Sequence, residues 1–202
     1  MPNSRRRPQP ETNVWIGYTD LLSNSLLILL ITIVITALAR ASNEKPPLLR
    51  LTEQESFRFP TGSYTLSPGF RAALNRRLPE IRDTINRYRI DSVEVIGHTD
   101  GQPSPGASNL DLLLPGSGQG DALRGYAVGS NTDLGLLRAL AVAKYLKARL
   151  QPEVRTNLVI RAYSAGSLID GSGRFAPADT QDRADRRRIE LRFTRQEDQS
   201  RG

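Results

Sequence analysis

The hydrophobic and polar positions divide the chain into one long apolar run and a mixed remainder. Leu21 to Ala39 is a stretch of 19 residues without a charge. As a helix it would be about 28 Å long, close to the roughly 30 Å hydrocarbon core of a bilayer. Trp15 and Tyr18 precede it, where aromatic rings favour the headgroup layer. The pattern predicts a transmembrane helix over 14–41.

A cleaved signal peptide is the alternative interpretation of this run. The run is longer than the roughly 7 to 15 apolar residues of such peptides, although TALARASNE (36–44) contains small residues that resemble a cleavage site. Arg5, Arg6 and Arg7 favour a cytoplasmic tail at 1–13. Basic residues also follow the run, so the positive-inside rule does not decide the orientation by itself.

Polar residues in and beside the run lie on one face of the predicted helix. Asp20 stands at its entrance, and the others follow at steps of three or multiples of four: Ser23, Asn24, Thr32 and Thr36. Such a stripe should face another protein helix or a wet cavity, since ionisable residues within membranes usually mark ion pathways. Asp20 is therefore a candidate ion carrier. The alternative is a carboxylate solvated by headgroups just outside the hydrocarbon.

Strand and helix patterns alternate between residues 51 and 195, after a short linker at 42–50 and before a tail at 196–202. Strands are predicted at 51–59, 92–97, 156–164 and 188–194. Helices are predicted at 67–88, 131–150 and, as a short segment, 179–187. This order predicts an α+β sandwich.

Local signals support the two longer helices. Ser67 and Pro68 begin the first, which carries an apolar stripe: Phe70, Leu74, Leu78, Ile81, Ile85 and Tyr88. Pro79 interrupts that helix, so we expect a kink or two abutting helices. Asn131-Thr132 are expected to cap the second. The glycine-rich and proline-rich residues 101–130 predict a long loop, which is usually functional or disordered.

Composition narrows the classes of function. The chain has 202 residues, a formal charge of +7, no cysteine and one histidine. A disulfide framework, a thiolate metal site and a multi-histidine metal site are therefore excluded, and His98 is expected to be a packed residue. No set of nucleophile and base stands out, and GSGQG (116–120) lacks the lysine of a phosphate-binding loop. We expect neither an enzyme nor a cofactor. The arginines are interleaved with acids, which favours a solvated basic surface over a nucleic-acid site.

Four segments in order resemble the OmpA-like peptidoglycan-binding domain: FPTGSYTLSP (59–68), VEVIGHTDG (93–101), NTDLGLLRALAVAKYL (131–146) and DRADRRRIELRF (182–193). Together with YTD (18–20) at the start of the apolar run, the whole chain resembles the B subunits of ion-driven membrane motors. These are the MotB-like flagellar stator subunits and the ZorB-like subunits of Zorya anti-phage systems. The resemblance implies an OmpA-like domain over 51–195.

The resemblance also implies partners and a location. It implies a homodimer inside a pentamer of a multi-span A subunit, MotA-like or ZorA-like, in the bacterial inner membrane. The domain would lie outside the cytoplasm and bind peptidoglycan, and Asp20 would carry H⁺ or Na⁺. A flagellar stator and a passive peptidoglycan anchor remain alternative functions; the anchor would need the helix and the domain but no polar stripe.

The site residues follow from the same resemblance. Asp100 would bind the ammonium, and Arg138 the carboxylate, of the diamino acid in the peptide stem. Other family positions are matched by Asn131, Leu134, Arg187 and Arg188. The alternative is an ion pair of aspartate and arginine without a ligand.

Three features depart from the family pattern. Gly135 replaces a serine, Arg186 replaces an asparagine, and the loop from 100 to 131 is longer than usual. Pro46-Pro47 stand where the plug helix of MotB would follow the membrane helix, so the sequence shows no clear counterpart of that plug.

Overall fold

The computed structural model describes residues 14–42, 45–53, 56–104, 106–114, 123, 125–151, 154 and 157–195. The tails predicted at 1–13 and 196–202 lie outside the described residues. The chain divides into two units, Met1–Lys45 and Pro46–Gly202.

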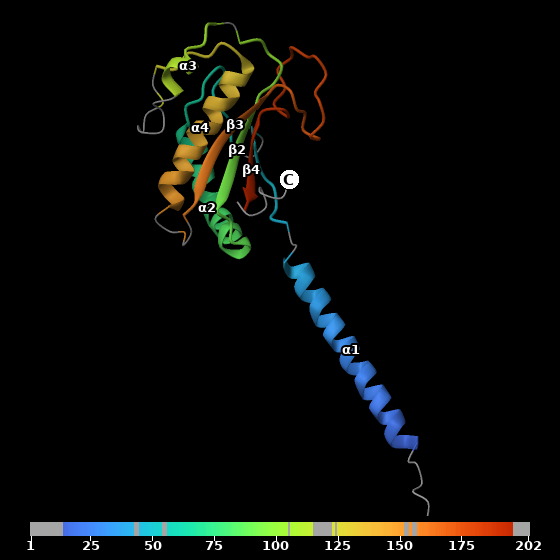
Figure 1. Ribbon diagram of the computed structural model, residues 1–202. Coiled ribbons are helices and arrows are strands. Elements are labelled where there is room, and N and C mark those ends of the chain that lie inside the picture. Colours follow the sequence, from blue (N-terminus) through green and yellow to red (C-terminus); the bar gives the residue numbers. More distant parts are fainter. Residues whose placement is uncertain are drawn as a thin grey trace, which may run out of the picture. The chain divides into compact units, whose positions relative to one another are not determined.

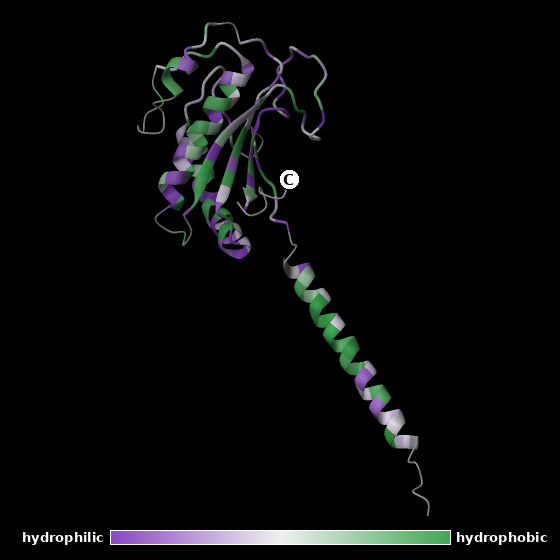
Figure 2. Cartoon of the chain, viewed as in Figure 1, coloured by the Kyte–Doolittle hydropathy of each residue, from purple (hydrophilic) through white to green (hydrophobic). Residues whose placement is uncertain are grey.

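The first unit contains one helix, α1 (Val14–Ser42), which confirms the predicted apolar helix (Figure 1). Within it, Trp15–Arg40 is 26 residues long and apolar enough to cross a membrane, and none of it is buried. Polar residues concentrate toward its N-terminal end (Figure 2). An exposed surface of leucine, isoleucine and valine suits hydrocarbon rather than water.

The second unit is an α+β domain, as predicted. Its elements are β1 (Leu49–Thr52), α2 (Pro68–Tyr88), β2 (Ser92–His98), α3 (Leu110–Leu113), α4 (Asn131–Leu150), β3 (Val159–Gly166) and β4 (Arg188–Thr194). The strands form one sheet in the order β1-β4-β2-β3. β4 is antiparallel to both of its neighbours, whereas β2 and β3 are parallel.

One hydrophobic core joins α2 and α4 to the sheet. Helix α2 begins at Ser67, whose side chain accepts a hydrogen bond from the backbone N–H of Phe70, and it continues through Pro79 as a single helix. The two abutting helices that we considered are therefore not present. Its predicted apolar stripe is buried except for Tyr88, which is partly exposed. From the sheet, the core includes Val93, Val95, Ile189 and Leu191.

The first predicted strand is wrong in its length. β1 ends at Thr52, whereas the prediction continued to residue 59. Phe57 and Phe59 are buried, but they follow a residue with positive φ, Ser56, and lie outside the strand. Both rings pack on Phe70, with centroid distances of 5.3 and 4.6 Å. Their apolar character reflects core packing rather than strand pairing.

Two other boundaries are shifted. The N-cap of α4 is Ser130, whose hydroxyl accepts from the backbone N–H of Asp133, rather than Asn131-Thr132. β3 runs from Val159 to Gly166, later than the predicted 156–164.

The short helix predicted at 179–187 is wrong. This segment consists of turns and bends. Asp179 accepts a hydrogen bond from the backbone N–H of Gln181 at 2.8 Å, and such bonds compete with helix formation. The segment also lacks large apolar residues that could bury one face of a helix.

Two glycines allow α4 to lie directly on β2. A Cβ atom at Gly97 would lie 2.0 Å from the carbonyl oxygen of Gly135. A Cβ atom at Gly135 would lie 2.5 Å from Oγ of Ser164 and 2.9 Å from the carbonyl oxygen of Gly97. This contact gives a physical reason for glycine at position 135, where the resembling family has serine.

We expect Gly135→Ala to lower the free energy of unfolding by about 1–3 kcal/mol, because overpacking outweighs the gain in helix propensity. Chemical denaturation measures the change. The control is Gly69→Ala in α2, where the added Cβ meets only Oγ of Ser67 at 3.9 Å. Ser164→Ala should partly restore the stability of the Gly135 variant. An unchanged stability of Gly135→Ala would contradict this close approach.

Candidate functional site

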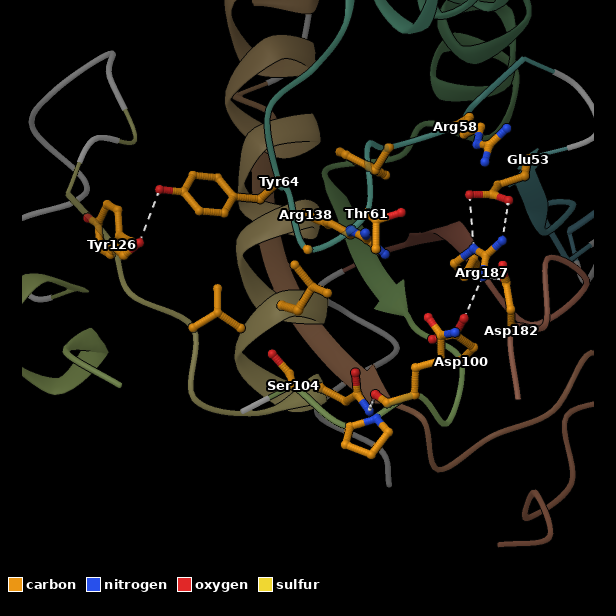
Figure 3. A pocket seen from close by; sticks show the side chains of 17 residues that line it. Glu53, Arg58, Thr61, Tyr64, Asp100, Ser104, Tyr126, Arg138, Asp182 and Arg187 are labelled. Atoms are coloured by element: carbon orange, nitrogen blue, oxygen red, sulfur yellow. Dashed lines mark hydrogen bonds and ion pairs between the residues drawn. The ribbon is translucent and has the colours of Figure 1, made fainter. Parts of the chain in front are cut away.

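A pocket of about 510 Å³ lies at the ends of β1 and β2, beside the first turns of α4. Its wall combines residues from segments 58–64, 100–104 and 126–134 with Glu53 and Arg187. Figure 3 shows charged side chains at one end, tyrosines at the other and Arg138 between them. The predicted site residues Asp100, Asn131, Leu134, Arg138 and Arg187 all line this pocket.

Asp100 is buried directly after β2, with 6% of its surface exposed. The backbone fixes its position, because the N–H of Thr99 donates to the carbonyl of Gly166 at 2.8 Å. Its Oδ2 accepts from Nη1 of Arg187 and from the backbone N–H of Arg183. Among the described residues no donor bonds to Oδ1, which leaves that oxygen for a ligand.

Arg187 is held by three carboxylates. Its Nε and Nη2 donate to the two oxygens of Glu53 at 3.0 and 2.8 Å, as a fork, and its Nη1 donates to Asp100 and Asp182. The bonds to Glu53 contribute most to raising the pKa of Arg187 above its ordinary value; burial opposes them. One guanidinium among three carboxylates leaves this end of the pocket with an excess of negative charge.

Arg138 is 3% exposed and projects from α4 into the pocket. Its Nε donates to the carbonyl of Ser63 at 2.9 Å, its Nη2 donates to that of Pro60 at 3.5 Å, and its guanidinium lies 4.9 Å from the ring centre of Phe59. Burial lowers the pKa of Arg138 to about 10, although nearby carboxylates oppose the shift. The side chain is therefore still cationic at neutral pH.

Asp100 and Arg138 do not pair with each other among the described interactions. The surface ion pair of these two residues that we considered as an alternative is therefore not present among the described interactions, and Asp100 pairs with Arg187 instead. Arg138 instead bonds to neutral backbone carbonyls and no described residue accepts from its Nη1. Its positive charge therefore has no bonded counter-ion within the described residues.

Asn131 and Leu134 shape the pocket. The side-chain amide of Asn131 donates to the carbonyl of Gln102 at 2.8 Å, which fixes the start of the loop after β2. Leu134 is buried in the wall. The amide nitrogen of Asn131 is thus used to position a loop.

Arg188 does not line this pocket, unlike its neighbour Arg187. Its Nε donates to Glu190 at 2.9 Å, and Nε2 of His98 lies 3.6 Å from the same carboxylate. His98 and Arg188 together hold the pKa of Glu190 at about 2, although burial opposes them. His98 is buried, as expected for a packed residue.

The sequence did not point to three pocket residues. Glu53 follows a short strand, and Tyr64 and Tyr126 lie in loops, so none belongs to a periodic pattern. The charge of Glu53 within the strand predicted at 51–59 was the only local signal. Its partner, Arg187, is 134 positions away in the sequence.

The polar face of α1 is organised around Asp20. Nδ2 of Asn24 donates to Oδ1 of Asp20 at 3.3 Å. The hydroxyls of Thr32 and Thr36 donate instead to carbonyls of their own helix. Ser23 lines a shallow hollow together with Asp20. The geometry places one carboxylate and one amide where a partner helix could reach both.

We find no candidate metal site in the part of the chain that the structure describes. It contains no group of three histidine, aspartate or glutamate side chains arranged to hold a metal ion.

We expect Glu53→Gln to weaken the fork on Arg187 and lower the free energy of unfolding by about 1–3 kcal/mol, the usual range for a hydrogen bond to a charged group. The matched control is Glu80→Gln, since Glu80 pairs with Arg77 at 2.7 Å and is 51% exposed. An exposed pair contributes only about 0–1 kcal/mol. Equal effects in denaturation would contradict a special role for Glu53.

No protein-family model matches the sequence, and no curated protein matches it. The periplasmic domain of Helicobacter pylori MotB is 22% identical, with a TM-score of 0.48, over 77% of this chain and 88% of that one. A MotB-like protein from Desulfovibrio vulgaris is 21% identical, with a TM-score of 0.45, over 74% and 75%. The cell wall anchor of the T6SS from Pseudomonas aeruginosa is 23% identical, with a TM-score of 0.41, over 73% and 80%. Likeness at this level leaves the function to follow from the residues of this chain.

Proposed function

We propose that the pocket binds the diamino acid of a peptidoglycan stem. The observation that carries this proposal is that one pocket is lined by both signs of charge: Glu53, Asp100 and Asp182 surround one end, and Arg138 forms no ion pair with them among the described interactions. A zwitterionic end group needs an anion and a cation at two separate positions. A pocket lined by acidic and basic side chains, rather than by side chains of one charge, suits such a group.

The ammonium would bind at Asp100. Oδ1 of this carboxylate has no described donor, and the excess of acid around Arg187 stabilises a second positive charge. Arg187 and Glu53 keep the carboxylate of Asp100 in place, so this side chain loses little conformational entropy when the ligand binds.

The carboxylate of the ligand would bind at Arg138. Two of its donors are fixed on the carbonyls of Pro60 and Ser63, which orients the guanidinium before a ligand arrives. Its buried position strengthens the attraction to an anion. Arg58 lines the same pocket on the side of Glu53, where it offsets part of the acid (Figure 3).

The polar residues of α1 favour a motor over a passive anchor. An anchor would need only an apolar helix, whereas α1 carries a carboxylate hydrogen-bonded to an amide one turn further along. Polar groups of this kind in a membrane helix usually serve an ion path or a partner helix. We therefore propose that the chain is the B subunit of an ion-driven motor and that Asp20 carries the ion.

The remaining parts of the proposal follow from that role. The chain would be a single-pass protein of the bacterial inner membrane, with the second unit in the periplasm. It would pair with a second copy inside a pentamer of a multi-span, MotA-like or ZorA-like partner. Pro46 and Pro47 after α1 do not fit a plug helix, which favours a ZorB-like anti-phage motor over a flagellar stator.

We expect the chain to copurify with a multi-span membrane protein encoded beside it. Mass measurement of the intact complex in detergent should give a dimer of this chain within a pentamer of the partner. Asn24→Ala and Thr32→Ala, which remove polar groups from the proposed contact face, should lower the yield of complex. Recovery of this chain alone from gentle detergents would support a passive anchor instead.

A further inference from the structure

The pocket extends beyond the charges that the proposed function uses. At the end away from Arg187, its wall is formed by Tyr64 and Tyr126 (Figure 3). Pro103 and Val128 also line the pocket. These four side chains carry no charge at neutral pH. The pocket therefore has a charged end and a neutral, partly aromatic end.

Tyr126 is held in a defined position by the loop that carries it. The side chain of Asn109 donates to the carbonyl of Gly125 at 2.8 Å and accepts from the N–H of Ala127 at 2.7 Å, one residue on either side of Tyr126. The Tyr126 hydroxyl donates to the carbonyl of Leu113 at 3.3 Å. Tyr64 then donates to the backbone carbonyl of Tyr126, also at 3.3 Å.

Close backbone packing supports the same segment. A Cβ atom at Gly106 would lie 2.7 Å from the carbonyl oxygen of Val128, and one at Gly129 would lie 2.8 Å from the backbone nitrogen of Ser108. The N–H of Gly129 donates to Asp133 at the start of α4. The tyrosine wall is therefore built into the domain through several independent contacts.

We propose that Tyr64 and Tyr126 form a second subsite, which binds the D-alanine residues that follow the diamino acid on its carboxyl side. This inference rests on the proposed function. Arg138 lies between the charged end and the tyrosines, so a ligand carboxylate at Arg138 would direct the rest of the molecule toward Tyr126. On that side a peptidoglycan stem consists of peptide bonds and methyl side chains, whereas the γ-linked D-glutamate on the amino side keeps a free carboxylate that a neutral wall would not suit.

The lining suits such a peptide. Aromatic faces pack against methyl groups and amide planes without requiring a charge. Because both tyrosine hydroxyls already donate to backbone carbonyls, the rings lose little freedom when a ligand binds. The sugar of peptidoglycan is attached further along the stem, beyond the residues nearest to the diamino acid.

The test compares two ligands on the full-length chain in detergent micelles. One is free meso-diaminopimelate, and the other is a tripeptide, meso-diaminopimelyl-D-Ala-D-Ala. We expect Tyr126→Ala to raise the Kd of the tripeptide about tenfold, a common effect of removing an aromatic contact residue, and to leave the Kd of the free diamino acid unchanged. Tyr126→Phe, which keeps the ring, should bind both ligands as the wild type does.

Tyr163→Ala is the control, since Tyr163 lies on β3, is 42% exposed and does not line the pocket. Equal weakening of both ligands by Tyr126→Ala, or of neither, would overturn the subsite while leaving the proposed function in place. Failure of the wild type to bind either ligand would contradict the proposed function and the subsite with it.

Discussion

Asp20→Asn should abolish ion flow through the assembled complex and every cellular task that depends on it. Asparagine keeps the size of the side chain and its ability to hydrogen-bond with Asn24, but it cannot gain and lose a proton or neutralise a cation. Proton or sodium uptake into vesicles that contain the chain and its partner measures the effect. Copurification of the variant with the partner is the control, because the complex should assemble normally.

The physical reason is the cost of charge in the membrane. A carboxylate at the centre of a bilayer costs about 3 kcal/mol on insertion scales, and less near the edge. When it is charged, Asp20 would favour polar groups of the surrounding partner; when it is neutralised, it could pass an apolar wall. Alternation between these states is what could drive movement of one subunit past the other.

Asn24→Ala separates this role from general polarity. Asn24 supplies the one side-chain bond to Asp20 among the described residues, so its loss should slow ion flow without abolishing it. An Asp20→Asn complex that still conducts ions would refute the motor and leave the peptidoglycan anchor as the function.

Arg138→Ala should abolish binding of the chain to purified peptidoglycan sacculi. Removal of one partner from a buried charge pair costs about 2–5 kcal/mol, which corresponds to roughly 30-fold to several-thousand-fold in affinity. Alanine also removes the bonds to the carbonyls of Pro60 and Ser63 and the contact with Phe59. The variant should therefore be less stable, and its folded fraction must be measured at the temperature of the pull-down.

Two further variants make the result specific. Arg149→Ala removes an exposed arginine from the same helix. Like Arg138, Arg149 lies over an aromatic ring, that of Tyr145, at 5.4 Å from its centre. This variant should bind as the wild type does. Arg138→Lys keeps the charge but loses the fork, and it should retain only weak binding. Equal binding by wild type and a folded Arg138→Ala variant would exclude Arg138 from the site.

Much of the fold follows from local patterns. The alternating valines of 92–97 and the alternation in 188–194 each predicted a strand. Both strands are present, as β2 and β4. The helix at 67–88 followed from its apolar stripe and from Ser67. The predicted helix at 179–187 failed because polar composition alone provides no face that could be buried.

Only some residues of the candidate site could be predicted from the sequence. Asp100 and Arg138 were identified by a family resemblance, and in the structure both residues line the same pocket. Glu53 and Tyr126 could not be identified, since each depends on a contact made by the tertiary fold. Glu53 meets Arg187 because β1 pairs with β4, and Tyr126 reaches the pocket because contacts of its loop, among them those of Asn109, hold it there.

The central claim is that one pocket binds both charged groups of a diamino acid. Titration calorimetry with three matched ligands tests this claim most directly. The ligands are meso-diaminopimelate, pimelate, which lacks the amines, and cadaverine, which lacks the carboxylates. We predict saturable binding of meso-diaminopimelate to the full-length chain, none of it to Arg138→Ala, and no measurable binding of the other two ligands. Binding of pimelate or cadaverine as tight as that of the zwitterion, or no binding of meso-diaminopimelate, would contradict the account.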